Sequence, residues 1–208
     1  MIGIVAALAL SPLQTTVPKI GLSFGVKETF QEADFLQSLR EQVRLGVDGF
    51  YTSLSWNELS PDGKTIDLKK LKEQEGIFKF TGADGLLTLK TIDTVRTTIP
   101  APLVGQGWRD LAPQIVPLWN AILDQCPKEM KWFSLGNEVD PYLAAQPQEV
   151  DGYLAFLETC RRAILAKRPD AKVGVTVTWE GLRKRPELAR RLLAFGDVAI
   201  LTYYPLND

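Results

Sequence analysis

Histidine is absent from the 208 residues of the chain, and cysteine occurs only twice. The lack of histidine excludes Ser-His and Cys-His nucleophile systems, His-ligated zinc and histidine acid/base chemistry within these residues. Carboxylates, lysine or tyrosine must therefore carry any proton transfer. Cys126 and Cys160 lack metal-ligand spacing and are too few for a disulfide scaffold, so we interpret both as buried or half-buried thiols. The sequence predicts no metal site and no cofactor.

The chain also lacks an excess of charge of either sign, with a net charge of -1 and a pI near 5.7. This balance gives no electrostatic reason to expect a nucleic-acid partner. Residues 1–17 hold a short apolar stretch that is too short to span a bilayer. The stretch is signal-like, although no positively charged segment precedes it, and it favours a secreted or periplasmic location. A cytoplasmic protein with a misassigned or incomplete start is the alternative.

From residue 18 to 208, short β-rich apolar runs alternate with longer helical patterns, and no Ser/Gly-rich linker divides them. This alternation predicts one domain with a parallel α/β fold. The expected strands lie at 20–25, 49–54, 85–91, 130–135, 172–177 and 198–203, and the expected helices at 33–45, after 67, and at 111–125, 150–167 and 186–195.

Six such units fit either a doubly wound sheet or part of a (β/α)8 TIM barrel. The doubly wound fold usually carries a Gly-rich phosphate-binding turn after its first strand, and residues 21–28 offer only Gly21 and Gly25. We therefore predict an incomplete TIM barrel of about six β/α units. In such a barrel the chemistry gathers at the carboxyl ends of the strands.

Polar and aromatic residues follow the second to the sixth of these predicted strands. Aromatic faces beside carboxylates and amides suit a sugar, because CH faces stack on rings and hydroxyls need both donors and acceptors. The residues in question are Trp56 and Glu58, Lys90 and Asp93, Asn137, Glu138 and Asp140, Trp179 and Glu180, and Tyr203 and Tyr204.

Residues 131–140, Lys-Trp-Phe-Ser-Leu-Gly-Asn-Glu-Val-Asp, resemble the end of the fourth strand in clan A glycoside hydrolases, and residues 55–63 are similar to their second-strand loop. The resemblance implies that Glu138 is the general acid/base and that Asn137 binds the sugar hydroxyl next to the anomeric carbon. It implies a carbohydrate partner, an oligosaccharide, polysaccharide or glycoside. We predict that Trp56, Trp179, Tyr203 and Lys90 contact this substrate.

The sequence departs from the clan A pattern, because its second strand carries no Arg and the chain has no His. The clan's nucleophile is a Glu at the end of a seventh strand, and no seventh strand is found here. We therefore expect retaining hydrolysis only in a complete parent enzyme, little activity from this chain, and open sheet edges at the first and sixth strands. The chain is then either a fragment or a natural short homologue.

Two other functions stay open at this point. A carbohydrate-binding pseudoenzyme would use the aromatic residues without turnover. A Schiff-base lyase would use Lys90, whose position at a strand end suits a carbonyl substrate, although an ion pair with Asp93 is the simpler interpretation.

Overall fold

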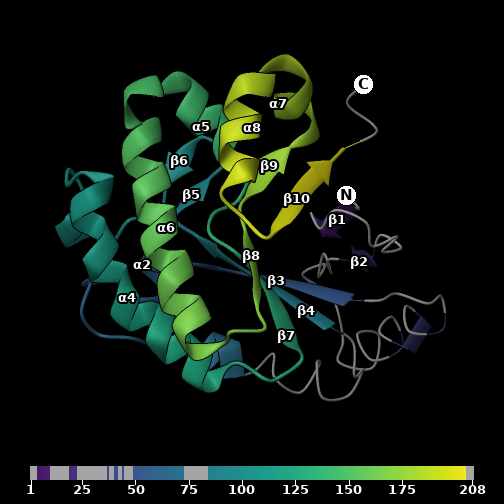
Figure 1. The fold of residues 1–208 in the computed structure, drawn as a ribbon. Coiled ribbons are helices and arrows are strands. Elements are labelled where there is room, and N and C mark those ends of the chain that lie inside the picture. The colour runs from purple at the N-terminus through teal and green to yellow at the C-terminus, as the bar shows by residue number, and fades with distance from the viewer. Residues whose placement is uncertain are drawn as a thin grey trace.

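The computed structural model of this chain describes residues 49–72 and 84–204, the two strands Ile4–Ala9 and Lys19–Leu22, and four helical positions at 37, 40, 41 and 44. Its main sheet has the order β8-β7-β4-β3-β2-β1-β10-β9 (Figure 1). The strands of this sheet are β1 (Ile4–Ala9), β2 (Lys19–Leu22), β3 (Gly49–Ser55), β4 (Asp84–Lys90), β7 (Met130–Ser134), β8 (Lys172–Gly174), β9 (Thr176–Thr178) and β10 (Val198–Tyr203).

Strands β8 and β9 are two halves of one segment, interrupted only at Val175. The first half pairs in parallel with β7, and the second half pairs in parallel with β10. The two end strands of the sheet order, β8 and β9, therefore belong to one continuous segment of the chain. This mixed α/β structure with a mostly parallel sheet is consistent with a partial TIM barrel.

Strand β1 corrects the expectation of open edges at the first and sixth strands. It is antiparallel to both neighbours, and Ile4 stands opposite Tyr203 of β10 and Leu22 of β2. The backbone groups of β2 and β10 that would otherwise face solvent thus have partners, which is how a sheet avoids an exposed edge. Six residues of the signal-like segment are part of the sheet.

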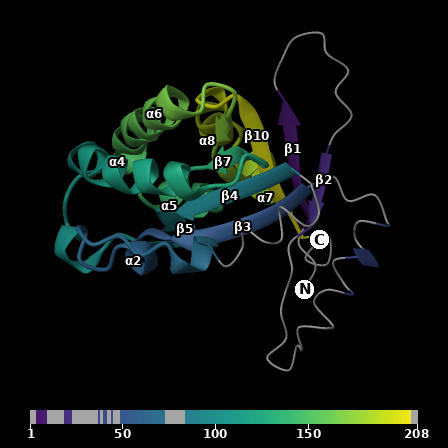
Figure 2. The ribbon, with the colours of Figure 1, turned by 90° about the horizontal axis from the view of Figure 1, so that it is seen from below.

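Figure 2 shows α4, α6 and α8 on the same side of β3 and β4. Helices α4 and α6 pack side by side (Figure 1). In α4, Leu111, Ile115 and Ile122 recur at helical spacing and are fully buried. The helices are α2 (Trp56–Leu59), α4 (Trp108–Gln125), α5 (Val139–Ala145), α6 (Val150–Lys167), α7 (Trp179–Lys184) and α8 (Pro186–Ala194), with short 3-10 turns at η1 (Ala101–Leu103) and η2 (Pro147–Glu149).

Two prolines, Pro113 and Pro117, lie inside α4 without ending it. Each proline removes one backbone hydrogen bond of the helix. Both prolines lie on the exposed face, four residues apart. Water can therefore solvate the freed carbonyl groups, while the buried face of the helix keeps its contacts.

The predicted strands and the predicted helices at 150–167 and 186–195 are found with small shifts at their ends, as far as the structure describes them. Residues 69–72 are helical, and so are the four described positions within the predicted helix 33–45, the rest of which lies outside the described residues. The end of the first predicted strand, residues 23–25, is also outside them. No helix within the described residues is long and apolar enough to cross a membrane.

Candidate functional site

The turn after β7 carries Asn137 and Glu138 and is built on two residues with positive φ. Gly136 has φ 137°, and a Cβ there would lie 2.5 Å from the hydroxyl of Tyr153, so only glycine fits. Glu138 itself is left-handed, with φ 49° and ψ 54°, directly before α5. A left-handed non-glycine residue costs about 1–2 kcal/mol, and such strain is concentrated at functional sites.

Glu138 is 6% exposed, and each of its carboxylate oxygens accepts a hydrogen bond from a hydroxyl group. The Thr94 hydroxyl donates to Oε2 at 2.9 Å, and the Tyr204 phenol donates to Oε1 at 2.6 Å. Burial and the hydrogen bond to Glu138 raise the pKa of Tyr204, so the phenol keeps its proton. Two loops far apart in the sequence thus fix the orientation of this carboxylate.

Thr94 belongs to a short hairpin that the sequence analysis missed, formed by β5 (Ile92–Asp93) and β6 (Arg96–Thr97). Its φ of 59° is also left-handed. The hairpin is joined to the Glu138 turn through the backbone, because the Asn137 N–H donates to the Ile92 carbonyl and the Thr94 N–H donates to the Asn137 carbonyl, both at 2.9 Å. The β-branched residues between 91 and 99 were the available sequence signal.

The side chain of Asn137 contacts Asp93, not Glu138. Its Nδ2 donates to Asp93 Oδ1 at 3.0 Å, and Lys90 Nζ lies 3.3 Å from Asp93 Oδ2. Burial raises the pKa of Asp93, but the hydrogen bond from Asn137 and the charge of Lys90 outweigh it, and the net pKa is lowered. Lys90 is therefore paired with an ionised carboxylate.

A cavity of about 240 Å³ opens beside Glu138. Trp179 and Tyr203 form part of its wall and are each 39% exposed, with ring centroids 6.2 Å apart in an edge-to-face arrangement. Thr94 and Tyr204 also line it, so the two hydroxyl groups that hold Glu138 face the same space. The structure thus brings three of the sequence-predicted residues, Glu138, Trp179 and Tyr203, to one cavity.

Asp140 connects the Glu138 turn to the start of α7. Asp140 is 1% exposed, and its carboxylate accepts two hydrogen bonds from Thr178, at 2.8 Å from the backbone N–H and at 2.7 Å from the hydroxyl. Burial raises the pKa of Asp140 above its ordinary value, although the hydrogen bonds from Thr178 oppose the shift. Because Trp179 follows Thr178 directly, Asp140 helps to place this ring in the wall of the cavity that Glu138 also lines.

Trp56 lies elsewhere. The structure places its ring in the core, 1% exposed and 6.2 Å from the ring of Phe156, and not in the cavity where a substrate contact was expected. The cause is helix α2, which begins at Trp56 immediately after β3 and turns the side chain inward beside Leu59. Lys90 and Asn137 do not line the cavity either.

The described residues hold no group of three or more His, Cys, Asp or Glu side chains that could bind a metal ion. The chemistry that the arrangement supports is proton transfer by a carboxyl group at the wall of a small aromatic cavity.

No protein-family profile matches the sequence, and no curated protein sequence matches it. Solved structures do match the fold. A GH5_18 protein from Bifidobacterium longum subsp. longum is 18% identical with a TM-score of 0.57, covering 70% of this chain and 38% of that chain. A GH5_18 variant from Streptomyces cattleya, in complex with Manβ1-4GlcNAc, is 12% identical with a TM-score of 0.61, covering 79% and 45%. A β-glucosidase is 13% identical with a TM-score of 0.55, covering 70% and 46%.

These likenesses show that the chain shares its fold with glycoside hydrolases over about 70% of its length, as the predicted resemblance implies for the fold. The chain spans 38% to 46% of the lengths of the three structures.

Proposed function

We propose that this chain is the sugar-binding, acid/base part of a retaining O-glycosidase, with Glu138 as the general acid/base. The observation that carries the proposal is the fixed Glu138 carboxylate, held by Thr94 and Tyr204 at the wall of a cavity lined by Trp179 and Tyr203. The glycoside hydrolases that share the fold support the choice of a sugar substrate, and one of them is bound to Manβ1-4GlcNAc.

In the complete enzyme, Glu138 protonates the glycosidic oxygen as the bond to the leaving group breaks. A second carboxylate attacks the anomeric carbon, and Glu138 then removes a proton from the water that releases the sugar. Trp179 and Tyr203 stack on the CH faces of the sugar. The resemblance to clan A enzymes gives Asn137 the hydroxyl next to the anomeric carbon; Asn137 does not line the cavity, and its amide donates to Asp93 at 3.0 Å.

The second carboxylate is the missing part of this proposal. Within the described residues, the other carboxylate that lines the cavity is Glu180, which is solvent-exposed and paired with Lys184. Lys184 lowers the pKa of Glu180, and the one hydrogen bond to this carboxylate within the described residues comes from Lys184 on the same helix. We therefore expect the 208-residue chain to bind a sugar without turning it over.

Titration calorimetry with Manβ1-4GlcNAc tests binding. Trp179→Ala should weaken the affinity at least about 10-fold, which corresponds to about 1.4 kcal/mol for the loss of one stacked ring. Glu138→Gln should also weaken it, whereas Glu180→Gln, a matched change in the same cavity, should have little effect. Equal affinity in wild type, Trp179→Ala and Glu138→Gln would contradict the assignment of this cavity as the sugar site.

Turnover is tested separately with p-nitrophenyl glycosides. The chain alone should show no hydrolysis above background, and a protein extended through the downstream coding sequence should hydrolyse one of them. Glu138→Gln in that extended protein should abolish activity towards poor leaving groups, which need protonation. An extended protein whose activity survives Glu138→Gln would contradict the acid/base role while leaving the binding result intact.

A further inference from the structure

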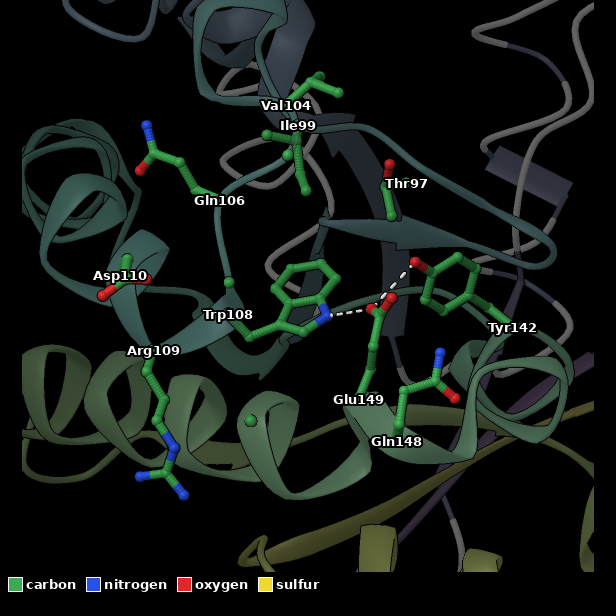
Figure 3. A pocket seen from close by; sticks show the side chains of 13 residues that line it. Thr97, Ile99, Val104, Gln106, Trp108, Arg109, Asp110, Tyr142, Gln148 and Glu149 are labelled. Carbon is green, nitrogen blue, oxygen red and sulfur yellow. Dashed lines mark hydrogen bonds between the residues drawn. The ribbon is translucent and has the colours of Figure 1, made fainter.

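A second and larger cavity, of about 590 Å³, lies away from Glu138. It opens between the turn that leads into α4 and the turn that leads into α6 (Figure 3). No lining residue is common to the two cavities. Helix α5 separates them, because Pro141 lines the smaller cavity and Tyr142, its neighbour in the chain, lines the larger one. The volume is within the usual range for small-ligand sites.

Glu149 is the best-organised polar group of this larger cavity. Its Oε2 accepts two hydrogen bonds, from the Trp108 indole N–H at 2.7 Å and from the Tyr142 hydroxyl at 3.0 Å (Figure 3). Burial and the Glu149 carboxylate raise the pKa of Tyr142 to about 12, so the phenol remains a donor at neutral pH. Both donors hold one oxygen, and within the described part of the chain no hydrogen bond reaches Oε1.

The remaining lining combines groups of several kinds. Gln106 and Gln148 present amides that both donate and accept hydrogen bonds, and Ile99 and Val104 supply apolar surface. This mixture fits hydroxyl groups, which also donate and accept, on a ring whose CH faces need apolar contact. It is poorly matched to a purely apolar ligand.

Charge narrows the ligand class further. The cavity is lined by two carboxylates, Glu149 and Asp110, and by one cation, Arg109. An anionic ligand such as a phosphate or an acidic sugar would face net repulsion, and the fixed carboxylate oxygen accepts hydrogen bonds only. A neutral ligand rich in hydroxyl groups has the complementary chemistry.

We propose that this cavity is a second carbohydrate-binding site, which takes a neutral sugar through hydrogen bonds to Glu149 and to the amides of Gln106 and Gln148. The site is independent of the one at Glu138 and does not depend on the catalytic assignment. Glu149 would anchor the bound sugar through hydrogen bonds, with its orientation fixed by Trp108 and Tyr142.

The competing explanation is that Glu149 only satisfies the buried indole N–H of Trp108. That role requires the two hydrogen bonds at Oε2 and predicts no ligand. The two explanations differ in what a sugar does to Trp108, because its indole N–H reports directly on the Glu149 carboxylate.

Two-dimensional ¹H–¹⁵N NMR of the full chain, titrated with cellobiose and separately with N-acetylglucosamine, tests the proposal. At least one of these sugars should shift the indole resonance of Trp108 in a saturable manner, and this shift should persist in Trp179→Ala. If the Glu138 cavity binds as well, the Trp179 indole of the wild type will follow a separate curve. Shifts of Trp179 alone, or no saturable shift of Trp108 with either sugar, would overturn the second site.

Substitutions complete the test. Gln148→Ala removes an exposed amide whose hydrogen bond goes only to Gln146 within the described residues, so the fold should be retained and the affinity should fall about 5-fold or more. Glu149→Gln should weaken binding further. Glu158→Gln, in the following helix α6 and outside the cavity, is the matched control and should leave the affinity unchanged. Unchanged binding in both Gln148→Ala and Glu149→Gln would refute the assignment.

Discussion

Gly181 lies so close to Asp140 that a single methyl group there should break the connection between α5 and α7. A Cβ at Gly181 would lie 1.8 Å from Oδ2 of Asp140 and 2.9 Å from the hydroxyl of Thr178. Because Asp140 is only 1% exposed, its carboxylate has no open space into which it can move. Gly181→Ala must therefore displace the carboxylate and disrupt both of its hydrogen bonds from Thr178.

The size of the effect follows from these two bonds. A hydrogen bond to a charged group contributes about 1.5–3 kcal/mol, so losing both costs about 4 kcal/mol. Replacing glycine by alanine inside a helix returns about 1 kcal/mol. We expect Gly181→Ala to lower the free energy of unfolding by about 3 kcal/mol, which corresponds to a decrease in Tm of about 6–12 °C for a domain of this size.

Urea unfolding followed by circular dichroism measures this change, and Gly152→Ala is the matched control. A Cβ at Gly152 would lie 3.6 Å from the Cβ of Trp108, an ordinary contact, and the position is within α6. This variant should be more stable by about 0.5 kcal/mol. The reasoning would be refuted if Gly181→Ala cost less than about 1 kcal/mol, or if it cost as much in an Asp140→Ala background, where the obstructing carboxylate is absent.

Three further predictions concern titration and surface charge. Burial raises the pKa of Asp140, so the folded state binds more protons than the unfolded state above about pH 4. The free energy of unfolding should therefore fall as the pH rises through the folded pKa. Asp140→Asn should reduce this pH dependence in urea unfolding, and an unchanged dependence would contradict the shift. Burial raises the pKa of Cys126 to about 12 and also raises the pKa of Cys160, so neither thiol should react with Ellman's reagent until the chain unfolds. Rapid labelling of the native protein would disprove this prediction. Arg161 donates two hydrogen bonds to Asp197, at 2.7 and 3.3 Å, and both side chains are 26% exposed. Arg161→Met should lower the free energy of unfolding by about 1 kcal/mol in dilute buffer and by less in 1 M NaCl. A decrease that does not depend on salt would indicate lost packing instead of a lost ion pair.

The regular elements were predictable because burial imposes a period on the sequence. Helix α6 has the bounds expected from its apolar spacing, and β10 coincides with a continuous β-rich run. Helix α7 was missed because its six residues, Trp179–Lys184, include only two apolar side chains and cannot show a helical period. The β5–β6 hairpin was not predicted either, because its strands are too short to show a period.

The site was less accessible to sequence reasoning than the fold. The position of Glu138 at a strand end could be read from the residues around it, but its left-handed backbone and that of Thr94 could not, because neither residue type favours a positive φ. The prediction that Trp56 contacts substrate was wrong, because the tertiary packing of α2, and not the local sequence, decides whether this aromatic ring is buried. The hydrogen bonds of Thr94 and Tyr204 to Glu138 join positions 44 and 66 residues away in the chain.

The antiparallel direction of β1 has a practical consequence. An antiparallel strand starts at the end of the sheet where its parallel neighbours finish, so Ile4 stands beside Tyr203, a residue of the Glu138 cavity wall. An affinity tag or fluorescent label attached ahead of Ile4 would therefore emerge close to that cavity, and one attached after Tyr204 would emerge there too. Tags at either end should be cleaved before sugar affinities are measured, while a dye at either end would serve as a local reporter of occupancy.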